Sequence, residues 1–177
     1  MISLLKMNSH EISFVKNVYE KSFPESEKKP FDMILDMFLK GLIDIYVIKE
    51  KDKRLGIAII DIYEDVVLLD YFAIDDIYRN KGYGSLVLRL LQEKYKDVMF
   101  VLEIESPDVP CHNLKERQRR KQFYLDNGMK SMGYLVSLGV PMEVFYYQKP
   151  VCFEKYKKLY WVLFHRDIGD RIMLKES

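Results

Sequence analysis

The sequence has few of the residues that define disulfide-rich or metal-binding proteins. Its 177 residues include two cysteines, Cys111 and Cys152, and three histidines, with no His-x-x-x-His or Cys-x-x-Cys pair. Two cysteines cannot form a disulfide framework, and in a reducing compartment both are expected to be free thiols. Cys111 precedes His112, but neighbours in sequence seldom face each other as nucleophile and base. We therefore expect no disulfide scaffold, no metal site and no thiol catalysis.

Long apolar runs and an excess of charge of one sign are also missing. No stretch approaches the roughly 18 apolar residues of a membrane-spanning helix, and the first six residues are too short for a signal-peptide core. We expect a cytoplasmic protein without a membrane partner. The formal net charge of +1 provides no overall field that would attract nucleic acid. We therefore expect no nucleic-acid partner.

The composition indicates one globular domain. Charged residues make up 31% and hydrophobic residues 49% of the chain, as in ordinary globular proteins. The length suffices for a sizeable core, and no linker rich in Gly, Ser or Pro interrupts it. We therefore expect a single domain over residues 1–177.

Hydrophobic periodicity predicts a mixture of helices and strands. Ser9 is the expected N-cap of the first helix, and Asn113 is the expected N-cap of the helix that ends at residue 127. The last helix, over 153–164, has an aromatic side, which we expect to pack on the core; the alternative is a dimer surface. Helices are predicted over 9–23, 31–40, 85–94, 113–127 and 153–164, and strands over 44–49, 55–63, 66–74, 98–105, 135–140 and 144–147, the last two around Pro141. This order predicts a mixed α/β domain with a central sheet.

The most informative stretch is Arg79-Asn80-Lys81-Gly82-Tyr83-Gly84, between the apolar strand 66–74 and a helical pattern. Glycines at such a junction allow a sharp turn and leave N–H groups at the positive end of a helix, which favours phosphate binding. A dinucleotide-binding loop would need a small residue at Val87, and no Gly-x-x-x-x-Gly-Lys-Ser/Thr occurs. The pattern that remains is Arg-x-x-Gly-x-Gly.

A second block follows one strand later. The stretch 119–129 has the composition of a polar helix that ends at Asn127-Gly128, and it contains Phe123 and Tyr124. Together the two blocks resemble the GNAT superfamily of acyl-CoA N-acyltransferases, whose loop is Gln/Arg-x-x-Gly-x-Gly/Ala and whose later helix carries Phe-Tyr-x-x-x-Gly-Phe. The resemblance covers residues 66–129. It implies an α/β (α+β mixed) fold with a central, mostly antiparallel sheet, helices on both faces and splayed central strands.

The resemblance also implies acetyl-CoA as acyl donor and direct attack by an amine in a ternary complex. In this family the loop amides hold the pyrophosphate, and the end of the preceding strand pairs with the pantetheine arm. Carried onto this chain, the cofactor-binding residues are Phe72, Ala73, Ile74, Arg79, Asn80, Lys81, Gly82, Tyr83, Gly84 and Ser85.

Two positions on the second block carry further implications. Tyr124 stands where the family has its general-acid tyrosine, and a phenol with a pKa of about 10 can give a proton to the departing thiolate. The alternative for Tyr124 is aromatic packing. Many members have an asparagine seven residues before this tyrosine; here it is Arg117, with Arg120 one turn later. Both arginines are candidate phosphate ligands, and the alternatives are solvated helix charges or a nucleic-acid surface.

Carboxylates in apolar strands supply the candidates for a general base. Asp70, Glu103 and Glu105 interrupt such strands, where a carboxylate is costly unless it is paired or functional. Strand alternation places Glu103 and Glu105 on one face. We favour Glu103, whose apolar neighbours Leu102 and Ile104 are expected to raise its pKa.

The acceptor is expected to be a small-molecule or protein amine. Glu25 and Glu27 could line its side of the site and attract it, but we favour the alternative that both are solvated surface charges. A homodimer is the alternative to a monomer that the aromatic side of the last helix suggests. The alternative to an enzyme is a non-catalytic CoA-binding or regulatory domain on the same fold.

Overall fold

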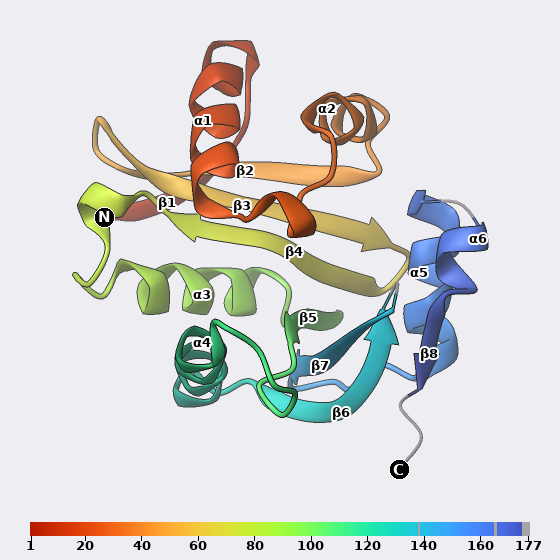
Figure 1. The fold of residues 1–177 in the computed structure, drawn as a ribbon. Helices are drawn as coiled ribbons and strands as arrows, with labels where there is room; N and C mark the ends of the chain where they lie inside the picture. Colours follow the sequence, from red (N-terminus) through yellow and green to blue (C-terminus); the bar gives the residue numbers. More distant parts are fainter. Residues whose placement is uncertain (138, 165, 175–177) are drawn as a thin grey trace. The chain divides into compact units, whose positions relative to one another are not determined.

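The computed structural model describes residues 1–137, 139–164 and 166–174 (Figure 1). The chain forms two compact units. The first comprises Met1–Asp61 and Leu69–Lys94, and the second comprises Ile62–Leu68 and Tyr95–Ser177.

The first unit is built on four strands in the order β1-β2-β3-β4, with β1 antiparallel to β2 and β2 antiparallel to β3. Helices α1 and α2 cover one face of these strands and α3 covers the other (Figure 1). Its elements are β1 (Ile2–Lys6), α1 (Ile12–Ser22), α2 (Phe31–Leu39), β2 (Ile43–Glu50), β3 (Lys53–Tyr63), β4 (Val66–Ile74) and α3 (Tyr83–Lys94), with short 3-10 turns η1 (Ser9–Glu11), η2 (Glu25–Glu27) and η3 (Asp76–Tyr78). β3 ends and β4 begins in residues that belong to the second unit.

The start of α1 differs from the prediction. The helical segment begins with the 3-10 turn η1, which Asn8 caps rather than Ser9: the Asn8 side chain accepts a hydrogen bond from the His10 N–H at 2.9 Å, and the Glu11 carboxylate accepts one from the Asn8 N–H. α1 itself follows with Glu11 at its N-cap position and no side-chain capping bond. This is a capping box, which satisfies donors at the helix start in both directions. The expectation of Ser9 was wrong because Ser9 already lies inside the 3-10 turn that precedes α1.

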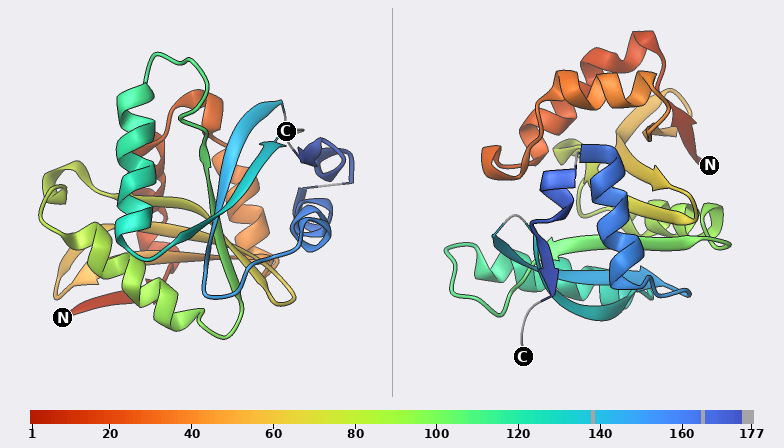
Figure 2. Two further views of the ribbon diagram at one scale, coloured as in Figure 1. Left: turned by 90° about the horizontal axis from the view of Figure 1, so that it is seen from below. Right: turned by 90° about the vertical axis from the view of Figure 1, so that its right-hand side faces the viewer.

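The second unit has strands in the order β5-β7-β6-β8, each antiparallel to its neighbour. Its elements are β5 (Met99–Glu105), α4 (Leu114–Asp126), β6 (Lys130–Ser137), β7 (Val140–Tyr147), α5 (Phe153–Phe164), α6 (Arg166–Gly169) and β8 (Ile172–Leu174). Figure 2 shows α4 on one side of the β5, β6 and β7 strands and α5 on the other.

Side-chain contacts confirm that α4 and α5 use opposite faces of this sheet. On β7, Phe145 contacts Tyr124 of α4 and lies opposite Leu102 of β5. The next residue of β5, Glu103, contacts α5. Successive side chains of a strand point to opposite faces, so the register places α4 on the Phe145 face and α5 on the Glu103 face.

The predicted turn at Pro141 was also wrong. Pro141 lies inside β7 opposite Val136, and β6 and β7 are joined through Gly139, which has a φ of +86°. Leu138, part of the predicted strand 135–140, lies outside the described residues. Proline at the second position of a strand leaves most of the ladder intact, and a left-handed glycine suits the turn.

The predicted fold class is confirmed, because the described residues form a mixed α/β protein with eight mostly antiparallel strands and flanking helices. The single-domain organisation and the splay of the central strands stay predictions. In the described part of the chain, no helix has both the length and the apolar character needed to cross a membrane.

Candidate active site

The glycine loop forms a tight turn between β4 and α3. Asp75 caps η3 by accepting a hydrogen bond from the Ile77 N–H at 3.3 Å. Asn80 and Gly82 then take left-handed conformations, with φ of +60° and +80°. A Cβ built on Gly82 would have no atom within 4 Å. The loop therefore presents open space in front of its backbone, immediately before α3.

The start of α3 supplies unpaired donors at this open space. The hydrogen bond from the Leu86 N–H to the Gly82 carbonyl, 3.3 Å long, closes the first turn of the helix. The N–H groups of a helix's first turn have no acceptor within the helix and carry the positive end of its dipole. For α3 these are the amides of Tyr83, Gly84 and Ser85. They provide a site for an anion such as phosphate.

The cationic side chains of the loop fold back onto its own backbone. Arg79 donates to the Ile74 carbonyl at 3.0 Å and pairs with Asp76 at 2.6 Å. Lys81 donates to the Ile77 carbonyl at 2.8 Å. The two side chains hold the turn in shape, and its amides remain available to a ligand.

The end of β4 is packed tightly against β3. A Cβ on Gly56 of β3 would lie 2.1 Å from the carbonyl oxygen of Ala73, closer than any real contact. The adjacent Asp75 N–H donates to the Leu55 carbonyl at 2.8 Å. Gly56 therefore lets β3 approach the segment 72–74, the predicted pantetheine-binding strand end. Sequence reasoning missed Gly56, although an isolated glycine in a strand is a signal of close backbone approach.

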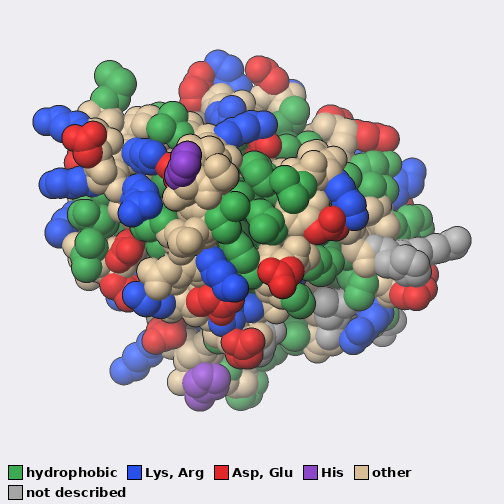
Figure 3. Space-filling model, turned by 90° about the horizontal axis from the view of Figure 1, so that it is seen from above, with side chains coloured by type: hydrophobic (Ala, Val, Ile, Leu, Met, Phe, Trp, Pro, Cys, Tyr) green, Lys and Arg blue, Asp and Glu red, His purple; other side chains and the backbone are tan. Residues whose placement is uncertain are grey.

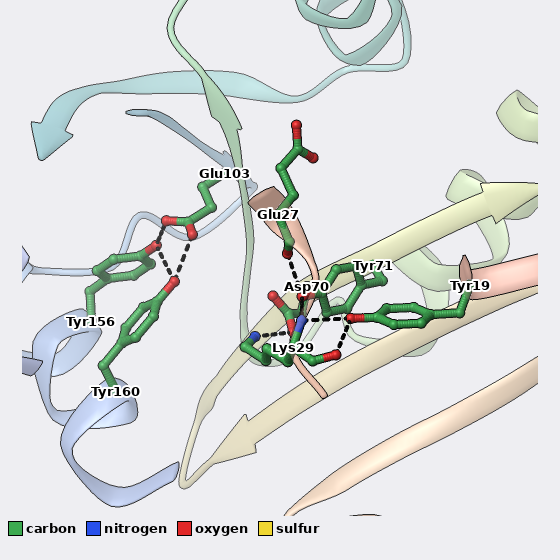
Figure 4. A network of polar contacts seen from close by, with 8 residues as sticks. All are labelled: Tyr19, Glu27, Lys29, Asp70, Tyr71, Glu103, Tyr156 and Tyr160. Carbon is green, nitrogen blue, oxygen red and sulfur yellow. Dashed lines mark hydrogen bonds and ion pairs between the residues drawn. The ribbon is translucent and has the colours of Figure 1, made fainter. Parts of the chain in front are cut away.

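Asp70, one of the candidate bases, belongs to a network that fixes the connection between α1 and α2 (Figure 4). The Lys29 ammonium pairs with the Asp70 carboxylate. Tyr71 donates its hydroxyl hydrogen to the Glu27 carbonyl at 2.8 Å, and Tyr19 donates to the Lys29 carbonyl at 3.0 Å. Burial raises the pKa of both tyrosines. The carboxylate of Asp70 is thus held by a cation as part of a structural anchor.

Glu25 and Glu27 begin and end the turn η2 in this connection. The Glu25 carboxylate pairs with Lys28 at 2.8 Å and is exposed. Charges of both signs are interspersed over the face of the molecule shown in Figure 3.

Tyr124 is 9% exposed on α4, between Phe123 and Phe145 at ring-centroid distances of 5.2 and 6.2 Å. Burial raises the pKa of its hydroxyl to about 12, an effect partly offset by the nearby charge of Arg120. Among the described residues no hydrogen-bond partner is found for this hydroxyl. Tyr124 therefore stays protonated at neutral pH, with its donor uncommitted.

Arg117 and Arg120 differ in their surroundings. Arg117 donates to the Asn113 side chain at 2.9 Å and to the Ser106 carbonyl at 3.1 Å, and it pairs with Glu105 at 2.6 Å. These contacts tie α4 to the end of β5. Asn113 was expected to cap α4, but its side chain makes no capping hydrogen bond and instead accepts the one from Arg117. Arg120 is half-buried and has no ion-pair partner among the described residues.

Glu103 is held by two phenols of α5. Tyr160 donates to Oε1 at 2.7 Å, and Tyr156 donates to Oε2 (Figure 4). Two phenols thus bond this carboxylate, whereas the side chains of Leu102 and Ile104 alternate to the other face. Tyr124 and Glu103 lie on opposite faces of the β5 and β7 pair.

The structure thus groups the predicted residues into three sets. The loop residues 79–85 lie together and follow the strand end 72–74, Tyr124 lies beside Arg120, and Glu103 lies with Tyr156 and Tyr160. Among the described residues, no three His, Cys, Asp or Glu side chains gather as a metal site would require.

Comparison with known proteins defines the class to which this arrangement belongs. Residues 12–119 match the model of the acetyltransferase (GNAT) family, and this range covers more than half of the chain and includes the glycine loop and Glu103. The protein belongs to the GNAT family of acetyltransferases. The match ends before Tyr124. A search of curated proteins found no significant match.

Solved structures share the fold at low sequence identity. A protein from Bacteroides thetaiotaomicron, described as an acetyltransferase of the GNAT family by similarity, aligns with a TM-score of 0.78 and 20% identity over 92% of this chain and 98% of its own. The ribosomal-protein-S18-alanine N-acetyltransferase of Escherichia coli aligns with a TM-score of 0.61 and 13% identity over 86% and 96%. A Bacillus subtilis acetyltransferase in complex with CoA aligns with a TM-score of 0.59 and 13% identity over 82% and 96%.

Proposed function

We propose that the protein transfers the acetyl group of acetyl-CoA to an amine, by direct attack in a ternary complex. The observation that carries this proposal is the open glycine loop at the start of α3, where Gly82 leaves its backbone uncovered. Membership of the GNAT family supports acyl transfer, and the Bacillus subtilis relative was solved with CoA.

The donor would be held mainly by backbone groups. The amides of residues 80–85 would bind the pyrophosphate, and the strand end 72–74 would pair with the pantetheine arm. Arg120 is a further candidate for a cofactor phosphate because its guanidinium is uncommitted. Arg117 would first have to leave Glu105, Asn113 and the Ser106 carbonyl, so we assign it to positioning α4 rather than to binding the donor.

The reaction would use one protonated and one ionised side chain. The amine nitrogen attacks the thioester carbon, an N–C bond forms and the C–S bond breaks. The Glu103 carboxylate accepts the proton that the amine nitrogen loses, and the Tyr124 hydroxyl donates a proton to the departing thiolate.

A thermal-shift comparison tests donor binding. A ligand that binds only the folded state at about 100 times its Kd stabilises it by about 2.7 kcal/mol, which raises Tm by about 5–10 °C for a chain of this size. We expect this rise with acetyl-CoA and CoA, and none with NAD or ATP at equal concentration.

Gly82→Ala locates the site, with Gly41→Ala as its matched control. Both glycines have positive φ, +80° and +71°, and neither has an atom within 4 Å of a built Cβ. Alanine therefore adds the same left-handed strain at each, about 1–2 kcal/mol. Only the methyl at residue 82 would stand where phosphate approaches. We expect Gly82→Ala to lose the CoA-induced shift and Gly41→Ala to keep it; equal shifts in both would refute the loop as the site.

A further inference from the structure

The aromatic side of α5 contains two tyrosines whose hydroxyls meet at one carboxylate. Tyr156 is fully buried and Tyr160 is 4% exposed. They lie one helical turn apart, with ring centroids 5.5 Å and hydroxyl oxygens 3.5 Å apart. Each donates to a different oxygen of Glu103, across 53 and 57 residues of sequence. α5 therefore donates a hydrogen bond to each oxygen of the Glu103 carboxylate (Figure 4).

Core packing alone does not account for these hydroxyls. Phenylalanine would present the same ring to the core, and a buried hydroxyl is costly unless it is hydrogen-bonded. Here both hydroxyls bond to a charged acceptor, which makes stronger hydrogen bonds than neutral groups do. A carboxylate offers about four acceptor positions. Two of these positions are taken by α5, one on each oxygen, which fixes the plane of the Glu103 carboxylate.

We propose that Tyr156 and Tyr160 are positioning residues for acetyl transfer, and that they fix the Glu103 carboxylate in the orientation in which it accepts the proton of the acceptor amine. This inference rests on the proposed function of Glu103. The phenols keep their own protons throughout: the amine loses one proton and Glu103 gains it. Loss of one phenol would let the carboxylate rotate and would remove a donor that stabilises its ionised form.

Among the described residues of β5 and β7, the other titratable side chains that alternate to the same face as Glu103 are those of Glu105 and Tyr146. Glu105 follows two residues later on β5 and is paired with Arg117 of α4. Tyr146 of β7 lies opposite Val101, on the same face as Glu103, and no hydrogen bond from its hydroxyl to Glu103 is found among the described residues. Tyr146 therefore provides a matched control for removal of a hydroxyl.

The test compares Tyr156→Phe, Tyr160→Phe, the double variant and Tyr146→Phe. The acceptor is first chosen from a panel of amines (spermidine, an alanine-ended peptide, free amino acids) as the one that gives the highest rate with wild type. Steady-state kinetics are then measured by the release of CoA thiol. Each α5 variant should lower kcat about tenfold, which corresponds to one hydrogen bond to a charged group. The KM for acetyl-CoA should not change. The acidic limb of the pH–rate profile should move to higher pH, because the carboxylate has lost a donor. Tyr146→Phe should behave as wild type.

Carbon NMR of labelled glutamate in the ligand-free protein separates this inference from the proposed function. The Glu103 carboxyl signal, assigned by its loss in Glu103→Gln, should titrate at higher pH in the α5 variants. An unchanged titration, or a changed titration with wild-type kcat, would overturn the positioning role. A Glu103→Gln protein with wild-type kinetics would instead show that Glu103 is not the base, whatever the NMR result, and the positioning role would fall with it.

Discussion

At the scale of single residues, the hydroxyl of Tyr124 is buried, protonated and uncommitted. Its pKa of about 12 keeps the proton in place over the whole neutral range. We predict that Tyr124→Phe, which keeps the ring between Phe123 and Phe145, lowers kcat by about 100-fold, in the range for loss of a general acid, with little change in CoA affinity. Steady-state kinetics with calorimetric titration of CoA would measure both. Wild-type turnover in this variant would reduce Tyr124 to a packing residue.

Glu103 gives a second prediction at this scale. An amine with a pKa of about 10 is mostly protonated at neutral pH and needs a base. Glu103→Gln should therefore lower kcat at pH 7 and recover part of it at alkaline pH, where free amine is abundant. Glu105→Gln is the control, because Glu105 pairs with Arg117 and its loss should reduce stability without this pH dependence. Identical pH–rate profiles for Glu103→Gln and wild type would exclude Glu103 as the base.

At the scale of elements, the site depends on how closely β3 approaches the end of β4. A methyl on Gly56 would meet the Ala73 carbonyl at 2.1 Å, and a backbone atom cannot move aside as a flexible side chain can. We predict that Gly56→Ala displaces residues 72–74, lowers stability by about 1–3 kcal/mol as overpacking does, and weakens CoA binding by more than tenfold. Urea unfolding and calorimetry measure the two effects.

Ala58→Gly, two residues further along β3, is the companion variant of Gly56→Ala. It exchanges the same two residue types in the opposite direction and should lower stability through the loss of a buried methyl. CoA affinity should be kept in Ala58→Gly. If CoA affinity is also kept in a destabilised Gly56→Ala protein, the strand end does not bind the donor.

The sequence predicted those helices and strands whose glycine spacing or hydrophobic periodicity is visible within a short stretch of chain. The glycine loop, α3 and α5 follow from glycine spacing and hydrophobic periodicity within short windows. β1, α6 and β8 were not predicted, because three to five residues are too few to show a period. The Gly56 contact depends on Ala73 of β4, 17 residues later in the chain, so only the paired strands reveal it.

The same limit applies to the candidate site. Tyr124 and the loop residues could be named because their motifs are contiguous, and Glu103 because a carboxylate interrupts an apolar strand. The partners of Glu103 could not be named, because Tyr156 and Tyr160 come from a helix more than 50 residues away. Arg117 was assigned to phosphate from its motif position, whereas the ion pair with Glu105 is a tertiary contact.

At the scale of the whole molecule, buried tyrosines make stability sensitive to alkaline pH. Burial raises the pKa of Tyr19 and Tyr71 in the first unit and of Tyr124 in the second. A raised folded-state pKa contributes stability that is complete below the unfolded pKa and is lost as pH rises through the folded value. For Tyr124 this window runs from about pH 10 to about pH 12. By pH 11 the loss should be about 1.4 kcal/mol.

Urea unfolding of wild type and Tyr124→Phe at pH 8 and pH 11 would measure how much of the alkaline loss of stability comes from Tyr124. Lysines and the other tyrosines affect both proteins alike, so the difference between the two pH-dependent losses isolates this residue. We predict a smaller loss in Tyr124→Phe. Equal losses would mean that the hydroxyl is not buried as the structure shows.

The central claim is that the protein moves an acetyl group from CoA to an amine. Mass spectrometry of a panel of polyamines, amino acids, aminoglycosides and peptides, incubated with isotope-labelled acetyl-CoA, tests it most directly. We predict label on an amine nitrogen of at least one class with wild type, and about 100-fold slower labelling with Tyr124→Phe. Stabilisation by CoA without label on any acceptor would contradict the claim and would indicate a non-catalytic CoA-binding protein instead.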